Sequence, residues 1–355
     1  MPLRKIAVLG LGKVGTLAAR LLHQGGFDVT GFDSRPATGP LPFAVRTLDL
    51  AADDGVRAAT EGFDAVLSCL PYRVNKRIAT AAHARGMHYF DLTEDVPTTQ
   101  AIIELSKTSR GLMAPQCGLA PGFVGIVGAA QVAAFAECRS LRLRVGALPQ
   151  HPTGLMGYAF NWSPEGVVNE YLNDCEVIED GVRKMVSSME WIETLYVEGV
   201  KLEAFTTSGG LGTICETYHG KIANIDYKTM RYPGHMRLMN FFFHELLMRE
   251  RRELAGEILT NAKPPVNDDI VYVHVSSEGT LDGRLQRREF VRAYRPLELA
   301  GGTQTAIAWT TSASAVAIIE MVRDGALPQT GFLKQEQVPF DRFLATTTGR
   351  LFEAH

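Results

Sequence analysis

The run Lys5-Ile6-Ala7-Val8-Leu9 is followed directly by Gly10-Leu11-Gly12-Lys13-Val14-Gly15. The first run predicts a buried parallel strand, and the apolar residues that continue at helical spacing predict a helix after the glycines. Gly10 then allows the tight turn, Gly12 lets the backbone approach a pyrophosphate, and Gly15 lets the helix pack close to the strand. The free amides at the start of the helix face the phosphates, and the helix dipole favours that charge.

An acid ends the second predicted strand, Asp28–Asp33, eighteen positions after Gly15. A carboxylate there accepts hydrogen bonds from both ribose hydroxyls of NAD and repels the extra phosphate of NADP. Arg35 could stack on adenine or hold that phosphate, so NADP remains possible. The alternative is a glycine-rich turn of a Rossmann-like sheet that binds no nucleotide. Besides the glycines, the predicted cofactor contacts in this part of the chain are Lys13, Val14, Asp33, Ser34 and Arg35.

The composition is typical of a globular enzyme. Hydrophobic residues make up 46% of the 355 residues and charged residues 21%. The length exceeds the usual size of one hydrophobic core and predicts two domains. The net charge of -3, without a long basic run, argues against nucleic acid as a partner. No apolar run has the length of a membrane span, and the start of the chain leaves no room for a signal peptide.

The five cysteines are odd in number and widely spaced, without a CxxC pair. This pattern predicts free thiols in a reducing cytoplasm and no structural zinc. No other metal-binding spacing occurs, so we expect no metal.

Residues 1 to about 130 alternate between predicted strands and helices, which indicates a parallel, doubly wound sheet. Further strands are predicted at 44–48, 65–70, 88–92 and 111–114, and helices at 73–85 and 123–135. Ligands of such sheets bind outside the carboxyl ends of the strands. The predicted contacts at those ends are Asp49, Leu70, Pro71, Cys117 and Gly118 for the cofactor, with Tyr72 for the substrate.

The pattern changes near residue 140. Residues 141–146 and 269–277 alternate as half-exposed strands do, and Asp180-Gly181 predicts a hairpin within 178–186. Residues 276–283 are rich in turn formers, and 284–294 returns as a partner strand. This pattern predicts a second domain with an antiparallel sheet, of α+β type.

Helices are predicted from Ser163, over 235–247 and over 310–323. We expect the last of these to return to the first domain, so that the second domain is an insertion with the active site in the cleft between the two. The predicted division is 1–139 with 309–355 for dinucleotide binding, and 140–308 for substrate binding and dimerisation. The run Phe241-Phe242-Phe243 favours core or subunit interface over a ligand site.

Four polar clusters could carry the chemistry. Arg231 offers a planar fork for a carboxylate, and His235 could accept a proton near neutral pH. Asp91 ends a central strand, where a carboxylate could hold an ammonium group or relay a proton. The other predicted substrate contacts are Asn161, Ser163, Thr207 and Ser208. The plainer alternatives are N-capping by Ser163, an ordinary loop at 206–210, a cap or cofactor contact by Asp91, and surface positions for the others.

Several of these stretches resemble the saccharopine dehydrogenase family, and within it the bacterial lysine 6-dehydrogenases. The similar segments lie in order along the chain from residue 6 to about 325, and the second-domain motifs are more specific than the glycine triplet. They are Gly10-Leu11-Gly12-Lys13-Val14-Gly15, Tyr89-Phe90-Asp91-Leu92, Cys117-Gly118-Leu119-Ala120-Pro121-Gly122, Gly157-Tyr158-Ala159-Phe160-Asn161-Trp162-Ser163, Leu202-Glu203-Ala204-Phe205-Thr206-Thr207-Ser208-Gly209-Gly210 and Tyr227-Lys228-Thr229-Met230-Arg231-Tyr232-Pro233-Gly234-His235.

The resemblance implies a Rossmann domain with an inserted domain, a homodimer or higher homo-oligomer, and oxidation of a C–N bond of an amino acid with NAD or NADP. It points to Asp91 and Arg231 as substrate contacts. For a lysine 6-dehydrogenase-like enzyme, the ε-carbon gives up hydride and water releases ammonia. Saccharopine and carboxynorspermidine reductases share the architecture and condense an amine with an aldehyde or keto acid, so that class remains an alternative. A non-catalytic NAD-binding sensor is the other.

Overall fold

The computed structural model describes residues 3–37 and 39–353, and the chain in it divides into two compact units. The first unit runs to residue 126, resumes from residue 308 and includes 299–302. The second takes up 127–298 and 303–307. The second unit begins at residue 127, inside the helix Phe123–Ala133, whereas the predicted border lay after residue 139. It ends at residue 307, next to the predicted border at residue 308.

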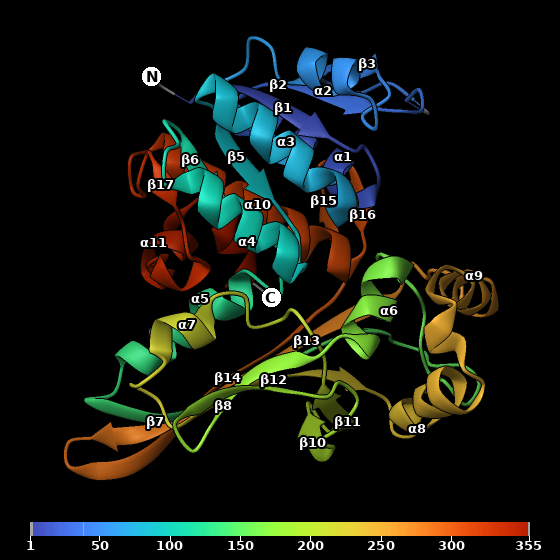
Figure 1. The fold of residues 1–355 in the computed structure, drawn as a ribbon, viewed down its shortest axis with the longest axis vertical. Coiled ribbons are helices and arrows are strands. Elements are labelled where there is room, and N and C mark those ends of the chain that lie inside the picture. Colours follow the sequence, from blue (N-terminus) through green and yellow to red (C-terminus); the bar gives the residue numbers. More distant parts are fainter. Residues whose placement is uncertain (1–2, 38, 354–355) are drawn as a thin grey trace. The chain divides into compact units, whose positions relative to one another are not determined.

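The first unit contains a seven-stranded sheet (Figure 1). Its strands are β1 (Lys5–Leu9), β2 (Asp28–Asp33), β3 (Ala44–Thr47), β4 (Ala65–Ser68), β5 (His88–Asp91), β6 (Leu112–Ala114) and β17 (Gly331–Phe332). Their order is β17-β6-β5-β4-β1-β2-β3, and each pair that is described runs parallel. The order reverses between β1 and β4, and the carboxyl ends there form the ligand crevice of doubly wound sheets. The predicted Rossmann fold is confirmed.

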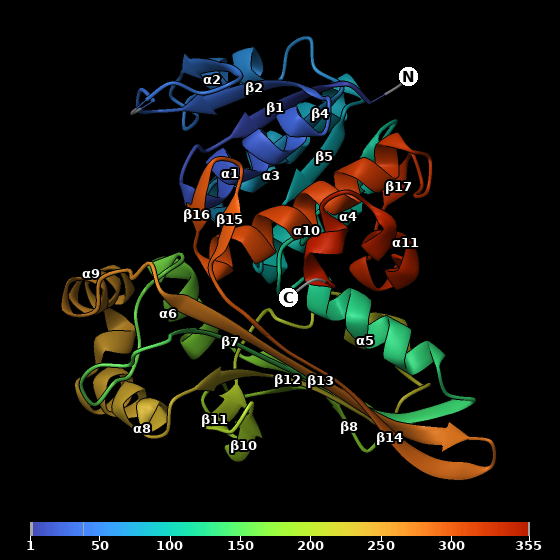
Figure 2. The same ribbon diagram turned by 180° about the vertical axis from the view of Figure 1, so that it is seen from behind.

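Helices cover both faces of this sheet. They are α1 (Lys13–Gln24), α2 (Asp53–Ala59), α3 (Tyr72–Arg85), α4 (Val96–Ser106), α10 (Ala306–Arg323) and α11 (Phe340–Ala345), with short turns η3 (Gln335–Gln337) and η4 (Gly349–Phe352). Figures 1 and 2 show α3 and α4 on one face, with α1 and the part of α10 from residue 308 on the other. Alternating faces are what right-handed crossovers between parallel strands require.

The core of the first unit follows from the apolar runs in the sequence. Every residue of β1 except Lys5 is buried, and α1 buries Leu17, Leu21 and Leu22 against the sheet. The end of the chain belongs to the same core, because the rings of Phe123 and Phe352 stack with centroids 4.1 Å apart. The C-terminal segment thereby completes the unit that the N-terminus begins.

The second unit is built on an eight-stranded sheet. Its strands are β7 (Glu137–Pro149), β8 (Cys175–Glu179), β9 (Val182–Val186), β10 (Glu193–Val197), β11 (Val200–Thr206), β12 (Asn224–Arg231), β13 (Asp269–Leu281) and β14 (Arg284–Tyr294). The main path is β10-β11-β12-β7-β13-β14, and β8 pairs with both β12 and β9. The prediction of an antiparallel sheet needs one correction, because β7 and β12 pair in parallel. Four other strands separate β7 and β12 along the chain, so no hairpin joins the two. A hairpin would require antiparallel pairing, and without one the two strands can pair in parallel.

Three hairpins of this sheet turn on a residue followed by glycine, both with positive φ. They are Asp180-Gly181, Glu198-Gly199 and Asp282-Gly283. Positive φ at both positions gives the turn twist that matches paired strands. The prediction at Asp180-Gly181 is confirmed, whereas the prediction that residues 276–283 are a turn is wrong for most of its length. Strand β13 continues to Leu281, because residues 276–281 pair with β14 and only Asp282 and Gly283 turn.

The helices of the second unit lie in the segments that connect these strands along the chain. They are α6 (Pro164–Leu172), α7 (Ile214–Tyr218), α8 (His235–Asn240), η1 (Phe241–Glu245), η2 (Met248–Glu250) and α9 (Arg252–Ala262), and α5 (Phe123–Ala133) spans the border between the units. The single helix predicted over 235–247 is therefore wrong in part. It passes into a π-helical turn at Phe241 and ends before Leu247, which has φ 56°. Of the three phenylalanines, Phe243 is buried in the core and Phe241 is exposed.

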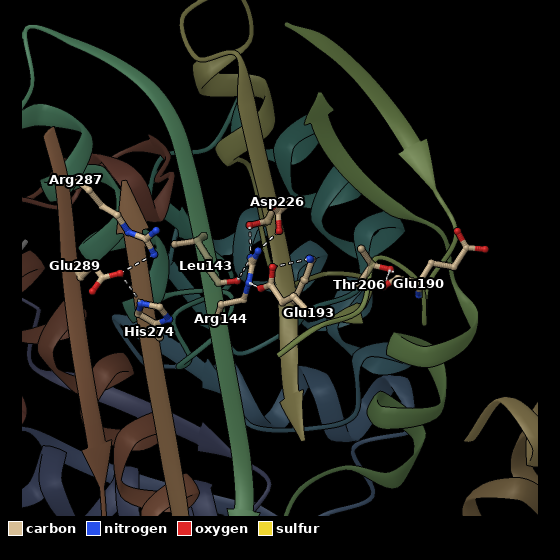
Figure 3. A network of polar contacts seen from close by, with 10 residues as sticks. Leu143, Arg144, Glu190, Glu193, Thr206, Asp226, His274, Arg287 and Glu289 are labelled. Carbon is tan, nitrogen blue, oxygen red and sulfur yellow. Dashed lines mark hydrogen bonds and ion pairs between the residues drawn. The ribbon is translucent and has the colours of Figure 1, made fainter. Parts of the chain in front are cut away.

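A buried ion-pair network crosses one face of this sheet (Figure 3). Arg144 on β7 lies 2.6 Å from Asp226 on β12 and also contacts Glu193 on β10, which accepts from Lys228 at 3.0 Å. Side chains alternate between the faces of a strand, so Lys228 and Arg231 of β12 point to opposite faces. The network is therefore separate from the surroundings of Arg231.

Candidate active site

The glycine turn leaves room for a ligand at one glycine only. A side-chain carbon on Gly15 would lie 1.8 Å from the carbonyl oxygen of Gly10, and one on Gly10 would lie 2.9 Å from that of Cys69. On Gly12, the same carbon would meet no atom within 4 Å. Gly12 precedes α1 without a side-chain cap. The open space and uncapped helix start at Gly12 are what a pyrophosphate group requires.

Asp33 holds the glycine turn to the end of β2. One carboxylate oxygen accepts the amide of Leu11 at 2.7 Å, and the other accepts the amide of Arg35 at 2.9 Å. The Arg35 guanidinium is 3.8 Å from the same carboxylate and is largely exposed. Each carboxylate oxygen keeps a second lone pair for a ribose hydroxyl. Ser34 and Arg35 lie on the exposed turn that follows, where an adenosine end would pass.

The other predicted cofactor residues lie in different settings. Leu70 faces Gly10, since its Cδ2 lies 2.9 Å from the place where a side chain on that glycine would begin. Asp49 follows the edge strand β3 and accepts the amide of Ala51 at 2.9 Å, so it shapes a turn. Pro71 precedes α3, and Tyr72 is the first residue of that helix. The structure brings Leu70 to the glycine turn and leaves Asp49 at the margin of the sheet.

Asp91 is fully buried and makes three hydrogen bonds. Tyr89 donates its hydroxyl at 2.7 Å, and the amides of Thr93 and Gln116 donate at 3.0 Å each. Burial raises the pKa of Asp91 to about 6, although these three hydrogen bonds oppose the rise. Asp91 therefore joins the ends of β5 and β6, and it titrates near the range in which a proton acceptor operates.

The turn after β6 places Cys117 and Gly118 in the core. Cys117 is fully buried and donates to the carbonyl of Ala114 at 3.1 Å. Two residues of the returning chain, which sequence reasoning missed, lie beside the predicted cofactor loops. Ser312 donates to the carbonyl of Val14 at 2.9 Å, and the Thr311 methyl lies 3.6 Å from the Cβ position of Gly118. The run Thr310-Thr311-Ser312 puts three hydroxyl groups into an otherwise apolar predicted helix. This departure from the apolar pattern is the sequence feature that could have indicated these residues.

In the second unit, Arg231 ends β12 and is 2% exposed. Its Nε donates to the Tyr171 hydroxyl at 2.7 Å, and its Nη1 donates to Thr229 Oγ1 at 2.5 Å and to the Met230 carbonyl at 2.9 Å. The guanidinium carbon lies 4.7 Å from the ring centroid of Tyr158. None of these partners is a carboxylate. A buried arginine with only neutral partners is suited to binding an anion.

His235 is buried at the start of α8, and both ring nitrogens have partners. Nε2 lies 3.0 Å from the Tyr171 hydroxyl, and Nδ1 lies 3.0 Å from the Met156 carbonyl. Burial and the charge of Arg231 lower the pKa of His235 to about 3. The ring is therefore neutral at physiological pH. Its predicted role as proton acceptor stays a prediction, and its Nε2 reaches other groups only through Tyr171.

Asn161 and Ser163 hold local structure in this unit. The Ser163 hydroxyl accepts the amide of Gly166 at 3.0 Å, so the N-capping alternative describes its position. The Asn161 carbonyl accepts the amide of Val266 at 2.7 Å. Asp269, in the same unit, caps α10 by accepting the amides of Ala306 at 2.6 Å and Ile307 at 2.9 Å. The substrate roles of Asn161 and Ser163 stay predictions.

Thr207 and Ser208 follow β11 and are buried. The amide of Ser208 donates to the Glu170 carbonyl at 3.0 Å, which fixes the turn against α6. The Thr207 hydroxyl is buried and has no hydrogen-bond partner within the described chain. Such an atom is uncommon in proteins, and a bound ligand can satisfy it.

No group of three or more histidine, cysteine, aspartate or glutamate side chains able to hold a metal occurs in residues 3–37 and 39–353. Over the same residues, no helix combines the length and apolar character needed to cross a membrane.

The parallel sheet and the glycine turn define a dinucleotide-binding protein of the Rossmann class. The profile of the saccharopine dehydrogenase NADP-binding domain matches residues 6–114, and that of the saccharopine dehydrogenase C-terminal domain matches residues 118–351. The chain belongs to the saccharopine dehydrogenase family. Its cofactor is a nicotinamide nucleotide, and it is an NAD(P)-dependent dehydrogenase of the amino-acid oxidoreductase class.

Solved structures share this fold. Apo saccharopine dehydrogenase (L-Glu forming) from Saccharomyces cerevisiae matches with a TM-score of 0.74 and 15% identity, over 96% of each chain. A DAP dehydrogenase of C. glutamicum in complex with DAP matches with a TM-score of 0.53 and 15% identity over 99% of each chain. An engineered D-amino acid dehydrogenase bound to NADP+ matches with a TM-score of 0.53 and 14% identity, over 99% of this chain and 98% of that one.

Proposed function

We propose that this protein oxidises a C–N bond of a free amino acid, with the ε-amine of L-lysine as the reacting group. The observation that carries the proposal is Arg231, a buried guanidinium whose hydrogen-bond partners are all neutral. A substrate carboxylate would accept from Nη2 of Arg231, because Nε and Nη1 already donate to neutral partners. The family supports an amino-acid substrate.

The cofactor fits the first unit. The open space at Gly12 and the uncapped start of α1 would receive its pyrophosphate, and Asp33 would accept from its ribose. When bound, the nicotinamide ring supplies the hydride acceptor. The residues of this chain then have two tasks, which are to orient the substrate and to accept a proton.

The proton must leave the substrate first. A carbon gives up hydride when its nitrogen is a neutral amine, so a bound ammonium group has to be deprotonated. Asp91, whose burial brings its pKa to about 6, is the proposed acceptor, directly or through water. His235 would serve only through Tyr171. Loss of hydride leaves an iminium ion, and water converts this ion to an aldehyde and ammonium.

The test is cofactor reduction, followed at 340 nm, with NAD and then NADP, against diamino acids led by L-lysine. Reduction with release of ammonia supports the proposal. Arg231→Ala should then raise KM strongly, because the carboxylate loses its partner. An unchanged KM would remove Arg231 from substrate binding.

A second candidate is a condensing reductase, which joins an amine to an aldehyde or keto acid. The match over 96% of both chains to the yeast saccharopine dehydrogenase favours it. Oxidation of NADPH or NADH that requires both an amino acid and a carbonyl compound would establish this candidate instead. Cofactor binding without turnover in either direction would indicate a sensor.

A further inference from the structure

The two carboxylate oxygens of Asp91 have different surroundings. Oδ1 accepts the amides of Thr93 and Gln116, both at 3.0 Å. Within the described part of the chain, Oδ2 accepts the Tyr89 hydroxyl at 2.7 Å and nothing else. A carboxylate oxygen has two lone pairs. Main-chain donors therefore occupy both lone pairs of Oδ1, whereas Oδ2 keeps one lone pair on which a proton can be placed.

Tyr89 is the side chain among these three donors. It lies on β5 two residues before Asp91, so both side chains point to the same face of the sheet. The Tyr89 ring is fully buried, and its hydroxyl has a second acceptor, the carbonyl of Asn75 on α3 at 3.4 Å. Asn75 is itself held, because its side-chain oxygen accepts the Ser68 hydroxyl at 2.7 Å. The single phenolic hydrogen can thus donate to Asp91 or turn to the Asn75 carbonyl.

Two thiols also lie beside Asp91. Cys69 follows Ser68, which pairs with Asp91 across the sheet, and the amide of Cys117 donates to the Asp91 carbonyl at 2.8 Å. Burial raises the pKa of Cys69 to about 12, and it raises the pKa of Cys117 and of Tyr89 as well. These three neighbours therefore stay neutral while Asp91 titrates. Hydrogen bonds, and not neighbouring charges, support its ionised form.

We propose that Tyr89 is a positioning residue for the reaction, which supports the ionised carboxylate of Asp91 and directs the substrate proton to Oδ2. This inference rests on the proposed function, in which Asp91 accepts the proton of the bound ammonium group. The N–H bond breaks, its electron pair stays on nitrogen, and an O–H bond forms at the free lone pair of Oδ2. After the transfer the phenolic hydrogen can turn to the Asn75 carbonyl, so no heavy atom has to move.

The first test needs no turnover. Carbon-13 NMR of the Asp91 carboxyl group in the full chain, assigned with Asp91→Asn, measures the midpoint of its titration. Tyr89→Phe should raise that midpoint by at least about one pH unit, because the charged form loses a hydrogen bond. Tyr232→Phe is the matched control and should leave the midpoint unchanged, since its hydroxyl donates to the Pro149 carbonyl at 2.9 Å in the other unit. An unchanged midpoint in Tyr89→Phe would overturn the inference.

The second test is the pH dependence of kcat. Tyr89→Phe should move the acidic limb of the profile upward by the same amount as the NMR midpoint, and most of kcat should return at alkaline pH, where Asp91 is ionised again. A loss of kcat by one factor at every pH would overturn the inference, because a purely structural effect does not follow the protonation of Asp91.

The NMR measurement also separates this inference from the proposed function. If no amine is oxidised but Tyr89→Phe still raises the midpoint, the proposed function fails and the support of Asp91 by Tyr89 stands. If Tyr89→Phe does not fold, replacement of Tyr89 by 3-fluorotyrosine is the second variant. Its phenol is a stronger acid and a stronger donor, so the midpoint should fall. A midpoint that does not move would again overturn the inference.

Discussion

Tyr171 donates its phenolic hydrogen to Nε2 of His235, 3.0 Å away. The direction of this hydrogen bond follows from the other contacts. The Met156 carbonyl is an acceptor, so Nδ1 of His235 must carry the hydrogen and Nε2 must accept. The Tyr171 oxygen in turn accepts from Nε of Arg231. A chain of hydrogen bonds therefore runs in one direction from Arg231 to the Met156 carbonyl and fixes the orientation of the guanidinium.

Tyr171→Phe removes the middle of this chain and keeps the ring. We expect the KM for the amino acid to rise about tenfold with kcat changed little, because Arg231 loses its orientation while the reacting groups remain. The free energy of unfolding should fall by about 1–3 kcal/mol, since Nε of Arg231 is left buried without an acceptor. Steady-state kinetics and urea unfolding measure the two effects. An unchanged KM with lowered stability would make Tyr171 a purely structural residue.

His235→Gln tests the neutral state of the imidazole. The pKa of His235 is about 3 in the folded protein, against 6.5 for the unperturbed side chain. The unfolded chain therefore binds more protons between these values, and stability is lost as the pH falls from 6.5 towards 3. His235→Gln should flatten that part of the curve of unfolding free energy against pH. A curve parallel to that of the wild type would show that His235 is not held neutral by the fold.

Asp91→Asn should change the same curve in the opposite sense. The pKa of Asp91 is raised from 3.8 to about 6 in the folded protein, so the folded state binds more protons between these values. Its buried carboxylate therefore costs stability as the pH rises from 4 to 6, by about 3 kcal/mol in total, and the cost remains above pH 6. The asparagine variant should lack this loss, as measured by chemical unfolding at pH 4 to 7.

The same variant tests the chemistry of Asp91. If Asp91 accepts the substrate proton, Asp91→Asn should lower kcat by about 100-fold or more and abolish its dependence on a group that titrates near pH 6. Retention of kcat in a folded variant would restrict Asp91 to joining the ends of β5 and β6.

Gly12→Ala and Gly15→Ala form a matched pair in the phosphate turn. An alanine at position 15 collides with the Gly10 carbonyl and should lower the free energy of unfolding by more than about 2 kcal/mol. An alanine at position 12 meets no protein atom, so the protein should keep its stability and lose affinity for NAD by about tenfold or more. Thermal unfolding and fluorescence titration with NADH distinguish the two. A Gly12→Ala protein with normal affinity would move the pyrophosphate away from this turn.

Asp33→Ala should weaken NAD binding by about tenfold, through the lost ribose contacts and a looser glycine turn. NADP affinity should fall less or rise, because the repulsion of its extra phosphate disappears. Asp28→Ala, an exposed acid at the other end of β2, is the control and should leave both dissociation constants unchanged. Equal losses for NAD and NADP would show that Asp33 only supports the turn.

The first unit was predictable from the sequence because its signals are local. Apolar runs followed by glycine or an acid mark β1 and β2, and parallel strands need helical crossovers between them. The position of Asp91 was also predictable, since it ends β5. Its three hydrogen bonds were not, because they come from Tyr89, Thr93 and Gln116, and the last of these is 25 positions away.

The second unit was less predictable for a physical reason. The parallel pairing of β7 with β12 and the position of α6 depend on contacts between residues that are far apart in the chain. Arg231 could be identified by its chemistry, whereas Tyr171, Glu170 and Met156 looked like ordinary helix and loop residues. The end of α8 at Asn240 was missed because Phe241-Phe242-Phe243 reads as a continuous helix. Spacing alone does not show that its rings divide between the core and the surface.

The first unit is assembled from stretches of chain on both sides of the second unit, and this has a consequence during synthesis. Strand β6 and Phe123 leave the ribosome early, but their partners β17 and Phe352 follow only after the whole second unit. At 5–20 residues per second, the edge of β6 stays bare for roughly 10–40 s. An uncovered strand edge can pair with another nascent chain. Shortening the C-terminus would make that temporary exposure permanent, so the last segment protects the finished chain from such pairing.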